Sequence, residues 1–345
     1  MYRTSVLLLM LLAIPACKGT PSSASAAPSS ATAGGGSEIN TPIATDSGPP
    51  APPKPTPLPI PAPGRGAANQ LGRIPVLEYH VIGGAKDGLY TRTAAHYLAD
   101  LDAAYKLGYR PITIAQMLDK NFSDVPAGMS PVVVVFDDAS PSQFRYVESG
   151  GQLQIDPTSG VGIWLAFAKT HPGWKNRATF CLLNGAAAGH NFFGDSPKFD
   201  GQKREWRFTK VKWLADNGFE LCDHTVWHAR LDKFSDAIVQ EQIARNQMGI
   251  DSAVPGYKIR TLALPYGIWP KNRQLAWQGT WTDPKTNQAH PYRFEAVLEV
   301  SGGPTRSPYD PAFNPHSINR IEAIGDDIQK TLTRLAQTNT RFVVK

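Results

Sequence analysis

Two adjacent carboxylates, Asp137 and Asp138, directly follow an apolar run in the stretch VVVVFDD (132–138). Each negative charge raises the cost of ionising the other, so a buried pair needs a positive partner. A divalent cation would supply it, because one aspartate could bind the ion while the other stays ionised as a base. The stretch therefore indicates metal chemistry at a strand end, although a lone Asp-Asp pair is more often a cap or a turn.

Two later patterns could complete such a site: HTVWH (224–228) and PYG (265–267). The histidines His224 and His228 stand at i and i+4, a spacing that projects both from the same side of a helical turn. Two imidazoles and one carboxylate leave an open position on a divalent ion, which can polarise a carbonyl and activate water. Alone, HxxxH is often a coincidence and Pro-Tyr-Gly is usually a turn. Their occurrence at three separate strand ends favours a site.

The elements that must position these residues follow the order typical of a parallel α/β fold, in which short apolar runs alternate with helical patterns. Helices are expected over 97–108, with Leu98, Leu101, Ala104 and Tyr105 on one face, over 210–218, and over 235–250 after Ser235 as N-cap. The segments 140–175 and 185–207 show no clear period and predict long loops. Strands are expected at 74–80, 131–138, 178–183, 218–224, 261–267 and 295–300. In a parallel barrel the strand ends converge on one face, so the three patterns can meet there.

The order FDD, HTxxH, PYG resembles that of the polysaccharide deacetylases, also called the NodB-homology family. PVLEYH (75–80) is similar to the opening of many extracellular members, and the resemblance spans about residues 74–325. It implies an α/β fold, a distorted seven-stranded (β/α) barrel. It also implies hydrolysis of N-acetyl or O-acetyl groups of polysaccharides with Zn²⁺ or another divalent transition metal such as Co²⁺.

The resemblance also implies roles for individual residues. Asp137 would be the general base, and a metal-bound water would attack the acetyl carbonyl. The amide of Tyr266 would help to hold the oxyanion, and Pro265 would fix the loop that presents it. The metal ligands would be Asp138, His224 and His228.

The chain departs from the family pattern at two positions near these motifs. Ala139 replaces the usual glycine after the aspartate pair, and Ala263 stands where many members carry the arginine that orients the base. Arg320 in HSINRIEA resembles an arginine of a later family segment and could reach the base instead; the alternative is a surface or helix-capping arginine.

Other candidates for the site have equally plain alternatives. In the family, a histidine usually acts as the general acid that protonates the leaving amine. It is hard to place here, because His316 lacks the Leu-x-His context of that histidine. His80 follows the first strand and could enter the same face as the site, or it could pack as a hydrogen-bonded histidine. Trp227 and Trp269 could stack on sugar rings, or pack in the core or at the rim.

Residues 1–17 have the layout of a secretion signal, and their end resembles a lipoprotein box with Cys17 as the lipid attachment site. An ordinary cleaved signal peptide is the alternative. Residues 18–70 are rich in Pro, Ala and Ser, which predicts a disordered tether and leaves 71–345 as the catalytic domain.

The net charge of +6 comes from scattered Lys and Arg side chains, and no basic run interleaved with aromatic residues stands out. This pattern argues against a nucleic-acid partner. Cys181 and Cys222 could be buried thiols or a disulfide between neighbouring strands.

The sequence thus predicts a monomeric, zinc-dependent polysaccharide deacetylase, lipid-anchored in the cell envelope. Its expected substrate is an acetylated glycan built on N-acetylglucosamine. The alternatives are a catalytically impaired carbohydrate-binding lipoprotein, and an amidase or esterase that acts on a non-sugar acyl compound.

Overall fold

The computed structural model describes residues 67–184 and 202–345. The predicted signal segment with Cys17, and the tether up to residue 66, lie outside the described residues. Within the described ranges, no helix combines the length and apolar character needed to cross a membrane.

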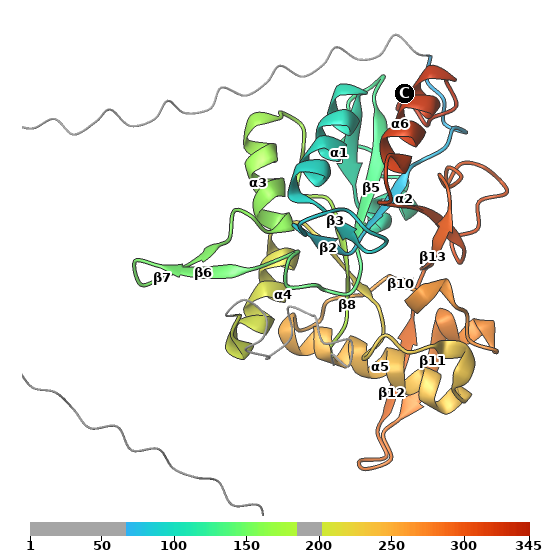
Figure 1. Cartoon of the computed structure of the whole chain (residues 1–345). Coiled ribbons are helices and arrows are strands. Elements are labelled where there is room, and N and C mark those ends of the chain that lie inside the picture. Colours follow the sequence, from blue (N-terminus) through green and yellow to red (C-terminus); the bar gives the residue numbers. More distant parts are fainter. Residues whose placement is uncertain (1–66, 185–201) are drawn as a thin grey trace, which may run out of the picture. The chain divides into compact units, whose positions relative to one another are not determined.

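Parallel strands form the centre of the fold, with helices around them (Figure 1), and their pairing closes them into a ring, as the sequence predicted. Seven strands make the ring in the order β1 (Val76–Tyr79), β14 (Ile318–Glu322), β13 (Ala296–Gly302), β10 (Thr261–Ala263), β9 (Glu220–Asp223), β8 (Thr179–Leu182) and β5 (Ser130–Phe136). Pairing of β1 with β5 closes it, with Glu78 opposite Val135. An eighth strand, β4 (Tyr109–Ile112), adds to the first half of β5. The expected seven-stranded barrel is therefore confirmed.

The strand β5 is buried along its whole length, because alternate side chains serve two cores. Val133 and Val135 pack with other ring strands in the barrel interior. Val132 and Val134 pack in the layer shared with the helices. This alternation explains the unbroken valine run, and it directs Asp137, two residues beyond Val135, towards the interior.

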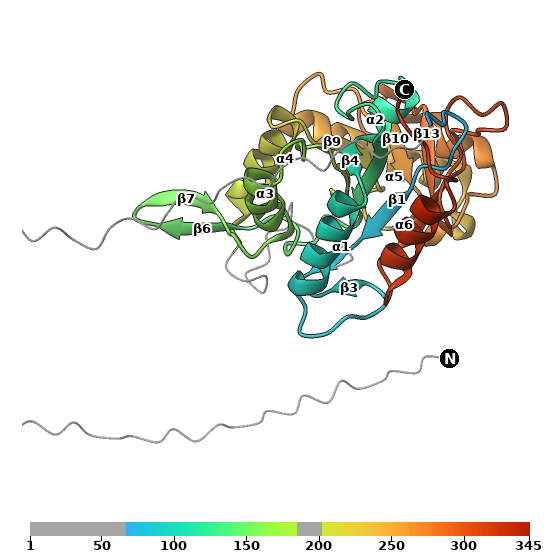
Figure 2. The ribbon, with the colours of Figure 1, turned by 90° about the horizontal axis from the view of Figure 1, so that it is seen from above.

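Helices surround the ring, as Figure 2 shows from above. They are α1 (Ala94–Lys106), α2 (Ile114–Leu118), α3 (Gly160–Thr170), α4 (Arg207–Asp216), α5 (Asp236–Ala253) and α6 (Asp327–Gln337). Of the side chains expected on the inner face of α1, Leu98 is instead 44% exposed, and Tyr97 takes the buried position. Ser235 stands at the N-cap of α5, but its side chain makes no capping hydrogen bond.

The prediction of a long loop over 140–175 was wrong. This segment holds α3, which starts at an N-cap Ser159 whose hydroxyl accepts a hydrogen bond from Gly162 N. It also holds an antiparallel hairpin that projects from the body, formed by β6 (Tyr146–Ser149) and β7 (Gln152–Ile155) (Figures 1 and 2). The two hairpin strands are largely exposed, so they lack the apolar alternation of a half-buried strand. Of the other expected loop, residues 185–201 lie outside the described residues.

Smaller elements complete the fold. Cys181 and Cys222 face each other in the register of β8 and β9, and they form a disulfide. The remaining short strands are β2 (Val81–Ile82) and β3 (Thr91–Arg92), which pair near the end of β1, and the hairpin of β11 (Gln278–Thr282) and β12 (Ala289–Arg293).

Candidate active site

A small pocket opens where the ring strands end, with a volume of about 150 Å³. All three sequence patterns contribute to it. Its wall is made by Glu78, His80, Tyr90, Asp137, Asp138, His224, His228, Leu264, Tyr266 and Val300. The parallel topology therefore brings together residues far apart in the sequence, as expected for a barrel.

The three predicted metal ligands lie side by side in this pocket. Asp138 Oδ1 is 3.3 Å from His224 Nε2 and 3.5 Å from His228 Nε2. His224 Nδ1 lies 2.9 Å from the carbonyl oxygen of Ala263, which fixes the tautomer that leaves Nε2 with a free lone pair. His224 Nε2 and Asp138 Oδ1 are buried and have no hydrogen-bond partner in the described part of the chain. A divalent cation would satisfy both atoms, so the three residues fit a metal ion.

The electrostatics of the pocket also favour a cation. Burial opposes protonation of His224, yet the negative charges of Asp137 and Asp138 raise its pKa to about 9. Burial and the neighbouring His224 lower the pKa of His228 to about 4, so this ring is a neutral donor at neutral pH. The two aspartates thus create an attraction for positive charge that a metal ion would satisfy.

The expectation that a helical turn carries both histidines was wrong. Residues 224–228 form an irregular loop in which Thr225 and His228 adopt left-handed φ values of 68° and 58°. Asp223 stabilises the loop, because its Oδ1 accepts a hydrogen bond from Thr225 N at 2.8 Å. The loop still directs both imidazoles to one side, with ring centroids 4.9 Å apart.

The turn after the aspartate pair is also left-handed, at Asp138 (φ 70°) and at Ala139 (φ 49°). The second value explains why the family favours glycine at the position of Ala139, since a side chain is strained there. Backbone strain of this kind is common in functional loops.

Asp137 is held by a single buried guanidinium. Nη1 of Arg320 donates to both carboxylate oxygens of Asp137, at 2.9 and 2.8 Å. Arg320 Nε donates to the carbonyl oxygen of Glu299, which lies on the irregular part of β13. Burial opposes ionisation of Asp137, but Arg320 outweighs it and lowers the pKa of this carboxyl below its ordinary value. Asp137 is therefore an anion beside the three ligands.

Two further pocket residues come from the end of β1. The sequence patterns assign no role to Glu78. For His80 they allow two positions, either in the site or packed as a hydrogen-bonded histidine. His80 Nε2 lies 3.5 Å from Glu78 Oε1, and its ring packs edge-on against Tyr90 at 5.0 Å. Glu78 has the same parity along β1 as the interior-facing Val76, a signal that could have placed it inside the barrel.

Other predicted site residues lie outside the pocket wall. Pro265 is buried in the turn, and Trp227 packs against the core. Trp269 donates to the carboxylate of Glu299 at 3.1 and 3.2 Å, and the guanidinium of Arg273 covers one face of its ring.

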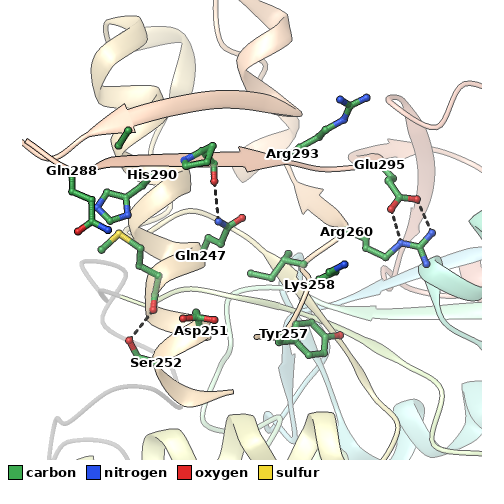
Figure 3. Close-up of a pocket in the computed structure, with 14 residues that line it drawn as sticks. Gln247, Asp251, Ser252, Tyr257, Lys258, Arg260, Gln288, His290, Arg293 and Glu295 are labelled. Carbon is green, nitrogen blue, oxygen red and sulfur yellow. Dashed lines mark hydrogen bonds and ion pairs between the residues drawn. The ribbon is translucent and has the colours of Figure 1, made fainter. Parts of the chain in front are cut away.

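The remaining histidine candidate, His316, lies outside the pocket wall, as does Arg260, the arginine next to the start of β10. His316 stacks on Trp277, with centroids 4.6 Å apart, which fits a loop role. Arg260 pairs with Asp119 and Glu295 at the opposite end of the barrel strands, on the edge of a larger surface pocket of about 740 Å³ (Figure 3). Arg260 therefore does not contact Asp137.

Comparisons with known proteins agree with this geometry. Residues 174–278, which include HTVWH and PYG, match the model of the polysaccharide deacetylase family. No curated protein sequence matches the chain. The fold is similar to that of the Streptococcus pyogenes deacetylase PplD in complex with acetate, with a TM-score of 0.52 and 16% identity over 76% of this chain and 98% of that chain. A polysaccharide deacetylase from Bacillus cereus gives a TM-score of 0.51 at 15% identity, over 77% of this chain and 69% of that chain. The matched motifs are thus assembled in one pocket of a barrel with the fold of these deacetylases, and residues 174–278 are similar to the polysaccharide deacetylase, or NodB-homology, family.

Proposed function

We propose that the protein is a metal-dependent hydrolase that removes acetyl groups, chiefly the N-acetyl group of N-acetylglucosamine, from an envelope or extracellular polysaccharide. One observation carries the proposal: the arginine-held carboxylate of Asp137 lies in the same small pocket as Asp138, His224 and His228. A base beside an open metal site is the arrangement that hydrolyses an amide with water.

The metal ligands would be Asp138, His224 and His228. A divalent ion such as Zn²⁺ or Co²⁺, when bound there, would polarise the acetyl carbonyl and lower the pKa of water.

The chain's own residues would move the protons. Asp137 Oδ2 accepts a proton from the attacking water, while Arg320 holds the carboxylate in place and keeps it ionised. The amide of Tyr266 donates to the oxyanion that forms on the carbonyl. As the C–N bond breaks, His80 gives a proton to the leaving nitrogen, which departs as an amine, and the acyl part leaves as acetate.

The size of the pocket supports an acyl group as the part of the substrate that enters. Its volume of about 150 Å³ is well below the roughly 300–1,000 Å³ of sites that enclose a drug-sized ligand. Tyr90 and Tyr266 line the same pocket and are 53% and 52% exposed, so their rings can contact a sugar at the mouth. This arrangement suits an acetyl group on a long glycan whose rings stay outside.

We also propose that Cys17 carries a lipid that anchors the protein to a membrane of the cell envelope. The basis is the sequence of residues 1–17. The predicted tether of residues 18–70 would let the enzyme reach glycan away from the membrane. Metabolic labelling with a palmitate analogue tests it, with Cys17→Ser as the variant that should lose the label. Label on neither protein would contradict the anchor.

Acetate release tests the activity. The purified protein, supplied with Zn²⁺ or Co²⁺, is incubated with acetylated chito-oligosaccharides and with O-acetylated glycans. We expect release from the N-acetylated substrate, and a loss of at least about 100-fold in Asp137→Asn, which keeps the shape of the side chain but not the base. Bound metal without acetate from any acetylated glycan or ester would contradict the proposal, and binding of the glycan alone would favour a carbohydrate-binding role.

A further inference from the structure

Glu78 is a buried carboxylate to which the mechanism above gives no part. Its side chain is 1% exposed at the end of β1, where the other strand residues are apolar or aromatic. Both of its oxygens are buried without a hydrogen-bond partner in the described part of the chain. Burying such a group costs several kcal/mol unless it is compensated, so its position in the catalytic pocket needs a reason.

Two side chains lie against this carboxylate. Oε2 is 3.3 Å from Arg320 Nε, and Oε1 is 3.5 Å from His80 Nε2. Arg320 is already held by Asp137 and by the carbonyl oxygen of Glu299. Among the described residues, no polar group other than Glu78 pairs with the ring nitrogens of His80. The neighbour that depends on Glu78 is therefore His80.

A second metal ion is a weaker explanation of the same cluster. Ligand atoms of Glu78, His80 and Asp137 do lie within 4.8 Å of one another. The guanidinium of Arg320, however, is 3.3 Å from one of these carboxylates and 2.8 Å from the other. It already supplies the positive charge that a cation would bring, and it would repel one.

We propose that Glu78 is a positioning residue for His80: its side chain lies 3.5 Å from Nε2 of the ring and sets the orientation in which the imidazole faces the leaving nitrogen of the substrate. This inference rests on the proposed function. Other charges also face His80, namely Asp137, Asp138, Arg320 and His224, but they belong to the base and to the metal ligands. In the step itself, the proton moves from His80 to the nitrogen as the C–N bond breaks, and Glu78 forms and breaks no bond.

Two substrates separate this role from help to the base or to the metal. An amide nitrogen must be protonated to leave, whereas the nitrophenolate of 4-nitrophenyl acetate leaves without a proton. In Glu78→Gln we expect acetate release from chito-oligosaccharides to fall by about 10- to 100-fold, while metal-dependent hydrolysis of the ester stays within about threefold of the wild type. Glu295 lies at the opposite end of the barrel strands, where it pairs with Arg260, and it lines no part of the catalytic pocket. The control Glu295→Gln should therefore leave both rates within about twofold.

A double-variant cycle supplies the second measurement. His80→Gln should show the same selective loss on the amide, and adding Glu78→Gln to it should change the amide rate by less than about twofold, because Glu78 acts through His80. Equal losses on amide and ester in Glu78→Gln, an unchanged amide rate, or fully additive effects would each overturn the proposal. If Glu78→Gln does not fold, an unchanged ratio of amide to ester rates in His80→Gln overturns it equally. Failure of the deacetylase function itself is distinguishable, since the metal-loaded wild type would then hydrolyse neither substrate.

Discussion

At the scale of single residues, the arginine that contacts Asp137 is Arg320, which does not stand at the position that the family pattern would give it. Ala263 stands at the family's usual arginine position, and its carbonyl oxygen instead accepts from His224. Arg320, on a strand two places away in the ring, supplies the guanidinium that contacts Asp137. A charged group that must contact Asp137 can thus come from any strand whose side chain reaches the interior at that level.

The contact predicts that Arg320→Lys impairs catalysis while the protein stays folded. Lysine keeps the positive charge, which avoids an uncompensated buried carboxylate, but its single ammonium cannot contact Asp137 while also replacing Nε of Arg320 at the carbonyl oxygen of Glu299. We expect kcat/KM for acetate release to fall by about 10- to 100-fold with little change in metal affinity. Arg260→Lys is the control, since Arg260 pairs with Asp119 and Glu295 at the other end of the strands. Similar rates in wild type and Arg320→Lys would show that the contact does not matter.

At the scale of elements, the turn of residues 265–267 requires glycine at position 267 for two reasons, its backbone conformation and the lack of space for a side chain. Gly267 has φ +64°, and a Cβ there would lie 2.9 Å from Cβ of Val300 on β13. A larger residue would therefore push the turn, and Tyr266 with it, away from the pocket. Since Tyr266 lines that pocket, the shape of the turn sets the position of the amide that we propose to hold the oxyanion.

We accordingly expect Gly267→Ala to lower kcat by at least about tenfold and to destabilise the protein by about 1–3 kcal/mol. The matched control is Gly256→Ala, because Gly256 also has positive φ (+78°) but a Cβ there meets nothing within 4 Å. This control should show the backbone penalty alone, with activity unchanged. Thermal unfolding and acetate release measure both effects, and equal activity in the two variants would contradict the link.

The helix α4 carries a buried amine that should make stability depend on pH. Lys210 is 0% exposed and donates to Gln202 Oε1 at 2.6 Å, and burial lowers its pKa from 10.5 to about 7. Between about pH 7 and pH 10 the unfolded amine binds a proton that the folded amine does not, so stability rises with pH across this window. Below pH 7 the cost of protonating the buried amine is fully present.

Lys210→Met should remove this dependence. We expect it to raise the free energy of unfolding at pH 6 by about 2–4 kcal/mol, and to flatten the rise in stability between pH 7 and pH 10. Gln202 keeps a donor in this variant, because Tyr146 N also donates to its Oε1 at 3.0 Å. Urea unfolding at several pH values measures the effect. An unchanged pH profile would mean that Lys210 stays charged in the folded state.

The sequence predicted most of these elements where the apolar pattern was strong. β5 and the strands of Cys181 and Cys222 were found because their residues are buried on both faces. β14 (INRIE) was missed because its inward position carries Arg320 rather than an apolar side chain, and β4 (YRPI) because proline and arginine interrupt the run. Arg320, the charge that obscures β14, is the side chain that contacts Asp137 in the candidate site, so the residue that forms this contact also interrupts the apolar pattern of its strand.

At the scale of the whole molecule, closure of the ring creates the surroundings of Asp137. Arg320 and Asp137 are 183 residues apart in sequence, yet β14 and β5 both neighbour β1, which carries Glu78. The register of these three strands, rather than any local motif, sets the charges around Asp137. No spacing rule within the sequence could have given this arrangement, since it requires the pairing of β1 with β5 that closes the ring.

The proposed metal should stabilise the whole barrel, because its ligands join parts that are otherwise separate. Asp138 follows β5, whereas His224 and His228 follow β9, and β8 lies between these strands. An ion that binds only the folded protein, at 100 times its Kd, adds about 2.7 kcal/mol of stability. For a domain of this size that corresponds to a rise in Tm of about 5–10 °C.

We expect EDTA to lower Tm by this amount and Zn²⁺ to restore it, with no response to either in Asp138→Asn. Asp137→Asn should keep the response while losing activity, since Asp137 is assigned to the base. If wild type and Asp138→Asn respond alike to EDTA and Zn²⁺, the three residues do not hold the ion.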